Sequence, residues 1–162
     1  MSPVQACDVP SGALLRKYQD GSGYVDCYVT EVACAVTQSA YVEAFYTTPL
    51  FRTERAILAL LASRPSSDDD VRALATNSRD AFAAWRVEDR KADQLLLADF
   101  TGRTRSWLMS SSLDDATRLY FGSAIVPKNG AMGIGFHSLL GFHKLYSHAL
   151  LRAARSRVLA KS

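Results

Sequence analysis

Two side chains able to transfer protons lie on apolar helical faces of this sequence. In the stretch 136–159, apolar residues recur at spacings of three and four around His143: they are Phe136, Leu139, Leu140, Tyr146 and Leu150. In the stretch 50–63, Glu54 falls on the side formed by Leu50, Phe51, Ile57, Leu58 and Leu61. Imidazole titrates near neutral pH, and a carboxylate facing a core must be paired, hydrogen-bonded or protonated. Should Glu54 and His143 meet across a cavity, they would form a general acid–base pair.

Structural roles explain the same two residues. His143 could be a core histidine that hydrogen-bonds a neighbour. Glu54 could form a structural ion pair, for which the candidate partners are Arg55, Arg105 and His143. The opposite face of the 136–159 helix is predicted to be solvated, because it carries His137, Lys144, His148, Arg152 and Arg155.

Aromatic residues in the second half of the chain could line a pocket for a ring-bearing or lipid-like ligand. The candidates are Trp85, Trp107, Tyr120 and Tyr146. Arg105 or His143 could orient a polar group of that ligand. In the stretch 103–109, strand alternation puts Arg105 and Trp107 on one face and the residues between them on the other, and which face is inward stays open. Core packing explains the aromatic residues equally well.

No short motif for nucleotide, metal or hydrolase chemistry occurs in the chain. The run Gly-Ala-Met-Gly-Ile-Gly at 130–135 lacks the lysine and hydroxyl residue of a phosphate-binding loop, and we interpret it as a flexible turn. Cys7, Cys27 and Cys34 are odd in number and have no metal-type spacing, which favours buried thiols in a reducing cytosol. We therefore expect no cofactor and no metal site.

Length and composition are those of one globular domain spanning 1–162. Hydrophobic residues make up 48% of the 162 positions and charged residues 22%. The net charge of +3 is mild, and the locally basic end at Arg152, Arg155, Arg157 and Lys161 is typical of a solvated helix terminus. We expect no nucleic-acid partner and no membrane insertion, because no apolar run approaches the roughly 20 residues that cross a bilayer. The stretch 1–10 lacks the features of a signal peptide, so we expect a cytoplasmic protein.

Periodicity and turn residues predict an ordered series of elements. A poorly structured segment at 1–22, with only a weak helical patch at 14–18, precedes a strand at 24–34. Helices follow, the first capped by Thr37, the second after Pro49 and the third starting near Asp68. The remaining segments are strands at 82–90, 94–99, 103–110 and 117–126, a loop at 127–135, and a long helix at 136–159.

This order predicts an α+β fold in which a long C-terminal helix covers one face of an antiparallel sheet. It resembles the helix-grip fold of START-like and polyketide-cyclase-like proteins, with two or three helices inserted after the first strand. The strings Tyr-Phe-Gly-Ser-Ala at 120–124 and Thr-Arg-Ser-Trp-Leu at 104–108 are similar to segments of an uncharacterised bacterial family with this fold. The resemblance covers the chain from Tyr24 onward and implies a cavity between sheet and helix.

Three functions follow as hypotheses. The first is the binding of a small apolar, aromatic or amphipathic molecule between the sheet and the C-terminal helix. The second is an enzyme of the cyclase, isomerase or hydrolase type that uses Glu54 or His143 as acid or base. The third is a homodimeric interaction module without a ligand, associating through a sheet edge or through the helix that carries Phe45 and Tyr46.

Overall fold

The computed structural model describes residues 2–127 and 136–161, which form an antiparallel sheet and the helices packed on it. In chain order the elements are β1 (Gln5–Ala6), the 3-10 helix η1 (Leu14–Tyr18), β2 (Tyr24–Val32), α1 (Gln38–Tyr46), α2 (Pro49–Ala62), α3 (Asp68–Ala75), β3 (Ala81–Phe82), β4 (Trp85–Lys91), β5 (Gln94–Asp99), β6 (Thr104–Ser112), β7 (Thr117–Ile125) and α4 (Phe136–Lys161). The glycine run predicted to form a turn at 130–135 lies outside the described residues.

The sheet has seven strands in the order β1-β2-β7-β6-β5-β4-β3, and each neighbouring pair is antiparallel. Strands β4 to β7 follow one another along the chain with short connections, which confirms the predicted meander. Strand β2 lies beside β7, with Tyr24 opposite Ile125 and Val32 opposite Thr117. The edge strands β1 and β3 are each two residues long, so each offers little backbone for pairing with another chain.

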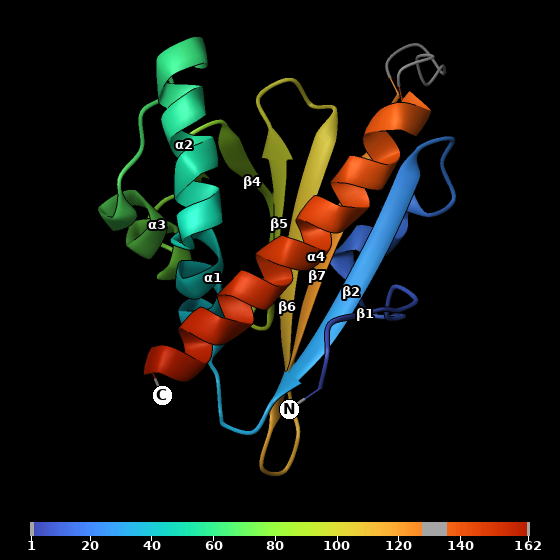
Figure 1. Ribbon diagram of the computed structural model, residues 1–162, viewed down its shortest axis with the longest axis vertical. Coiled ribbons are helices and arrows are strands. Elements are labelled where there is room, and N and C mark those ends of the chain that lie inside the picture. Colours follow the sequence, from blue (N-terminus) through green and yellow to red (C-terminus); the bar gives the residue numbers. More distant parts are fainter. Residues whose placement is uncertain (1, 128–135, 162) are drawn as a thin grey trace.

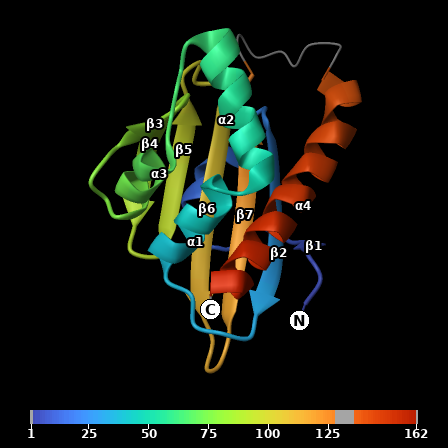
Figure 2. The same cartoon turned by 60° about the vertical axis from the view of Figure 1, so that its left-hand side comes forward.

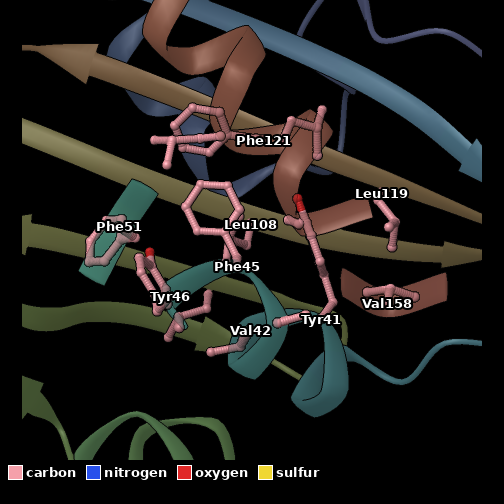
Figure 3. Close-up of a cluster of buried hydrophobic side chains, with 14 of the residues drawn as sticks. Tyr41, Val42, Phe45, Tyr46, Phe51, Leu108, Leu119, Phe121 and Val158 are labelled. Atoms are coloured by element: carbon pink, nitrogen blue, oxygen red, sulfur yellow. The ribbon is translucent and has the colours of Figure 1, made fainter. Parts of the chain in front are cut away.

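Helix α4 runs diagonally across one face of the sheet, with α1 and α2 beside it (Figure 1). We call this face the inner face and the opposite face the outer face. Figure 3 shows the core beneath the helices, where the ring of Phe45 lies 4.8 Å from that of Phe121 and the ring of Tyr46 lies 4.8 Å from that of Phe51. Phe45 is 1% exposed and Tyr46 0%. These two side chains therefore belong to the core and offer no surface to a second copy.

The outer face is covered by residues 2–18, which we call the N-terminal strap. In Figure 2 its short dark blue helix lies behind the sheet, on the side away from α4, whereas its beginning and β1 lie at the edge of the sheet beside β2. Leu15 is 0% exposed and packs with Val9, Trp107 and Cys27 in a second hydrophobic core, the outer core. The weak helical patch predicted at 14–18 is η1, but the prediction that the segment is poorly structured was wrong for residues 2–18, whose apolar side chains find their partners only on the folded sheet.

Local sequence signals explain where several elements begin and pack. The Thr37 hydroxyl accepts a hydrogen bond from the Ala40 amide at the start of α1, and Ser67 forms a capping box with Asp70 at the start of α3. Gly122 lies under the strap, where an added Cβ would stand 2.4 Å from Leu15 Cδ2. A glycine at this position of β7 therefore lets the strap approach the sheet.

The fold is the α+β helix-grip arrangement predicted from the sequence: an antiparallel sheet, a long C-terminal helix across one face, and shorter helices inserted after the first long strand. Within 2–127 and 136–161, no helix is both long and apolar enough to cross a membrane.

Candidate functional site

A cavity of about 180 Å³ lies between the inner face, α2 and α4; we call it the inner cavity. Its aromatic lining residues are Phe45, Phe51, Trp85, Phe121 and Tyr146. Its polar lining residues include Glu54, Thr104, Ser106, Ser123, His143 and Ser147. The predicted site residues Glu54, Trp85, His143 and Tyr146 therefore come together around one space.

Strand register places three polar residues in a row across the inner face. Asp26 on β2 is opposite Ser123 on β7, which is opposite Ser106 on β6. Residues directly opposite each other in an antiparallel pair project to the same side of the sheet. Ser106 is hydrogen-bonded to the Tyr46 hydroxyl from α1 at 2.8 Å, so this row continues into the helical layer.

His143 on α4 joins the other end of this row. Its Nε2 atom lies 2.7 Å from the Ser123 hydroxyl oxygen, which in turn donates to Asp26 Oδ1 at 2.6 Å. The second carboxylate oxygen of Asp26 lies 3.6 Å from the same Nε2 atom. An imidazole, a hydroxyl and a carboxylate thus form a continuous hydrogen-bonded network through which a proton could move.

The surroundings of Asp26 hold this network in place. Its side chain is 9% exposed, and it also accepts hydrogen bonds from the Ser123 amide at 3.1 Å and from the Tyr24 hydroxyl at 3.2 Å. The Tyr24 ring packs edge-on against the His143 ring, with centroids 6.0 Å apart. These contacts fix the imidazole against β2 and β7.

Glu54 approaches the inner cavity from α2, where it accepts a hydrogen bond from the Tyr146 hydroxyl of α4. Burial raises the pKa of the Glu54 carboxyl, and the hydrogen bond from Tyr146 lowers it by less. Burial also raises the pKa of Tyr146, together with the charge of Glu54. Glu54 therefore retains its proton to a higher pH than an exposed glutamate does.

The predicted ion-pair partners of Glu54 are bound elsewhere. Arg55 pairs with Asp68, its Nη1 atom 2.7 Å from Oδ1, and Arg105 pairs with Glu88. No hydrogen bond or ion pair between Glu54 and His143 is found within the described ranges. The two residues thus border the same cavity, each hydrogen-bonded to its own neighbours.

Two buried polar groups at the cavity have no protein partner in the described part of the chain. They are the indole N–H of Trp85 and the hydroxyl of Ser147, whose residue is 1% exposed. Most buried polar groups in proteins are hydrogen-bonded, and leaving one unpaired costs about 1–3 kcal/mol. An acceptor or hydroxyl on a bound molecule would remove that cost.

Three predicted site residues have side chains on the outer face instead. The Arg105 guanidinium is bound to Glu88 at 2.5 Å and to the Tyr18 hydroxyl at 2.8 Å, so the residue borders the inner cavity without offering it a charge. Trp107 is 0% exposed in the outer core, and Tyr120 packs beside it with ring centroids 6.3 Å apart. Strand alternation turned out to place the residues between them inward.

The face of α4 predicted to be solvated is partly covered. His148 lies against β2, its Nε2 atom 3.1 Å from the Val4 carbonyl oxygen and its ring edge-on to Tyr28. Arg155 donates to the Ser2 carbonyl at 2.7 Å. The start of the strap supplies these contacts. The prediction that His148 and Arg155 are solvated was therefore wrong, because it assumed that the strap is unstructured.

Asp26 and Ser123 are site residues that sequence reasoning missed. A carboxylate among the aromatic and β-branched residues of β2 is a signal that could have marked Asp26. Ser123 stands in the Tyr-Phe-Gly-Ser-Ala string at 120–124, yet nothing in the string shows its partners. Their pairing depends on the register between β2 and β7, which are separated by most of the chain.

Comparisons with known proteins give no family. No family model matches the chain, and no curated protein matches it. Among solved structures it is similar to CalU16 from Micromonospora echinospora, with 14% identity and a TM-score of 0.35 over 99% of this chain and 94% of that one. It is also similar to protein Ms6760 from Mycobacterium smegmatis, with 13% identity and a TM-score of 0.43 over 96% of each chain. A third structure, Ara h 8.0201, has 9% identity and a TM-score of 0.37 over 85% of this chain and 99% of that one.

The class of the molecule follows from its own geometry: a helix-grip α+β fold with a cavity between its sheet and its C-terminal helix. Likenesses as distant as these carry no ligand or activity over to this chain. The chemistry of the site therefore rests on the residues that line it.

Proposed function

We propose that this protein binds a small apolar or amphipathic molecule in the inner cavity. Two buried polar groups at this aromatic-lined cavity carry the proposal: the Trp85 indole N–H and the Ser147 hydroxyl. Neither has a hydrogen-bond partner in the described part of the chain. Ligand sites typically combine an apolar lining with a few polar groups that fix orientation. A ligand with an oxygen or nitrogen acceptor would satisfy the indole N–H.

The size and charge of the cavity narrow the ligand further. About 180 Å³ is below the roughly 300–1,000 Å³ of sites for drug-sized molecules, so a body of one or two rings fits best. The Arg105 guanidinium is held on the outer face, and Glu54 brings a carboxyl to the cavity. An uncharged ligand is therefore favoured over a carboxylate or phosphate, because Arg105 could not pair with a negative charge in the cavity.

Binding is tested with 2-naphthol and naphthalene, which share a ring body and differ in one hydroxyl. By calorimetry or fluorescence titration, the protein should bind 2-naphthol about tenfold more tightly, the equivalent of one hydrogen bond. Trp85→Phe should remove this preference while leaving the affinity for naphthalene. Trp107→Phe is the matched control on the outer face and should preserve the preference; no binding of either compound, or equal loss in both variants, would contradict the proposal.

A second candidate function, proton-transfer catalysis, is supported by the acid–base groups of the same cavity. Glu54 has a raised pKa, and His143 and Ser123 of the hydrogen-bonded network line the same cavity. Groups with shifted pKa values beside a cavity are candidates for general acids and bases. A carbonyl compound bound between them could lose a proton to one group while its oxygen is hydrogen-bonded by another.

Deuterium exchange into 2-tetralone tests this activity, because the compound is a small aromatic ketone with acidic protons. In deuterated buffer the protein should accelerate exchange beside the carbonyl, as measured by proton NMR. Glu54→Gln and His143→Gln should each reduce the acceleration at least tenfold. If the rate equals that of buffer, or if both variants retain it, the cavity binds without catalysing proton transfer.

A further inference from the structure

Cys7 and Cys27 face each other across the short ladder that attaches the strap to the sheet. The pairing of β1 with β2 places Ala6 opposite Tyr28, and the Cys7 amide continues the ladder with a 3.0 Å hydrogen bond to the Cys27 carbonyl. Their Sγ atoms are 3.4 Å apart. Directly opposed residues in antiparallel strands have Cβ atoms about 4.5–5.5 Å apart, close to the spacing that a disulfide bridges.

The two thiols differ in access. Cys27 is 3% exposed within the outer core, whereas Cys7 is partly exposed and lines an open groove of about 340 Å³ between the strap and the strands β2 and β7. A reagent in solution can therefore reach the sulfur of Cys7 first. The hydrogen bond with Cys27 is the largest influence on the pKa of Cys7 and lowers it, against the opposing effects of burial and of Asp8.

We propose that Cys7 and Cys27 form a dithiol modification site that a small-molecule disulfide oxidises to an intrachain disulfide. The Cys7 thiolate attacks one sulfur of the small disulfide, forming a mixed disulfide and releasing one small thiolate. The Cys27 sulfur then attacks the Cys7 sulfur, its proton passing to the departing group, and the second small thiol leaves. Both protein thiols are oxidised, and the small disulfide is reduced to two thiols.

The Cys7–Cys27 disulfide would attach the strap covalently to strand β2. Strand β1 has two residues, so few backbone hydrogen bonds attach this part of the strap, and most of its hold comes from apolar side chains such as Leu15. A bridge between residues 20 apart in sequence closes a loop that includes η1 and the outer-core residues Val9, Ala13 and Leu15. Closing that loop restricts the unfolded chain and stabilises the folded one.

The experiment treats the reduced full-length protein with oxidised glutathione and follows intact mass, thiol content and Tm. The wild type should lose two hydrogen atoms and two titratable thiols, and its Tm should rise by roughly 5 °C. Peptide mapping should join the peptides that contain Cys7 and Cys27. Cys34→Ser is the matched control and should form the same bridge with the same rise in Tm.

Single-thiol variants test the order of attack. In Cys27→Ser the reaction should stop at a stable glutathione adduct on Cys7, whereas Cys7→Ser should leave Cys27 unmodified. Cys27→Ala is the second variant if a serine at this buried position prevents folding. A wild type that accumulates the adduct without bridging, a bridge mapped to Cys34, or equal oxidation of Cys7→Ser would each overturn the proposal.

Discussion

The two sides of the sheet differ in how completely their buried polar side chains are hydrogen-bonded. On the outer face, the Trp107 indole N–H donates to Gln94 at 3.0 Å, and Glu88 accepts from Lys17, Tyr18 and Arg105. On the inner face, the Trp85 indole N–H and the Ser147 hydroxyl have no partner in the described part of the chain. A filled core with satisfied polar groups suits stability, whereas a cavity with unsatisfied groups suits a ligand.

The carboxyl groups on the two faces show the same contrast. Burial works to raise the pKa of Glu88, but hydrogen bonds from Lys17 and Tyr18 and the charge of Arg105 lower it overall. At Glu54 burial prevails over its hydrogen bond, and the pKa rises. The outer carboxyl is therefore held charged and the inner one protonated to a higher pH.

Replacing Trp107 with alanine should have the largest effect on stability. The residue is 0% exposed and fills the outer core beneath the strap. We expect the free energy of unfolding, measured by urea denaturation, to fall by about 3–5 kcal/mol. A loss below about 1 kcal/mol would show that Trp107 is not packed in a filled core.

Glu88→Gln should have the next largest effect, because it removes the charge that three side chains contact. We expect a loss of about 1–2 kcal/mol at neutral pH, reduced by the partial exposure of the group. The lowered pKa predicts a stability contribution that is present above about pH 4.5 and lost as the pH falls through the folded-state value. The free energies of unfolding of wild type and variant should therefore converge as the pH falls. A difference between them that stays constant with pH would contradict this.

A pair of serine substitutions compares a satisfied hydroxyl with an unsatisfied one. Ser106→Ala removes the partner of the buried Tyr46 hydroxyl and should cost about 1–2 kcal/mol. Ser147→Ala removes a buried hydroxyl without a described partner and should change stability by less than about 0.5 kcal/mol. Thermal denaturation of the two variants decides the comparison, and equal losses would show that Ser147 is bonded within the protein.

Glu54→Gln should have a small effect on stability, with the opposite pH dependence to Glu88→Gln. Because its pKa is raised above the ordinary value of 4.5, the contribution of Glu54 is fully present below that pH and is lost as the pH rises through the folded-state pKa. The stability of the wild type relative to the variant should therefore fall as the pH is raised from about 4 to about 8. Tm measured across this range checks the sign.

Residue patterns predicted the inner face better than the outer one. Apolar spacing predicted inward faces for Glu54 and His143, and both residues line the inner cavity; of the four aromatic pocket candidates, Trp85 and Tyr146 line it as well. The strap escaped prediction because Val9 and Leu15 have no period of their own, and their burial depends on Trp107 and on the bare backbone at Gly122. Arg105 and Trp107 were placed correctly on a common face, but that face could not be assigned without knowing that the strap covers it.

The hydrogen-bonded network of Asp26, Ser123 and His143 could not be predicted from the sequence for a different reason. Asp26 and Ser123 are neighbours only through the register of β2 against β7, a pairing across most of the chain. Short-range periodicity carries no information on such a register. The same holds for Cys7 and Cys27, whose approach depends on the position of β1.

The proposed ligand cavity is tested most directly by the two tryptophans, which lie on opposite sides of the sheet. The chain has two Trp residues, so a proton–nitrogen NMR spectrum contains two indole signals. On titration with 2-naphthol, the Trp85 indole signal should shift downfield as it gains an acceptor, while the Trp107 signal, already bonded to Gln94, should stay in place. Unchanged signals at saturating probe, or a shift of Trp107 alone, would contradict a binding site on the inner face.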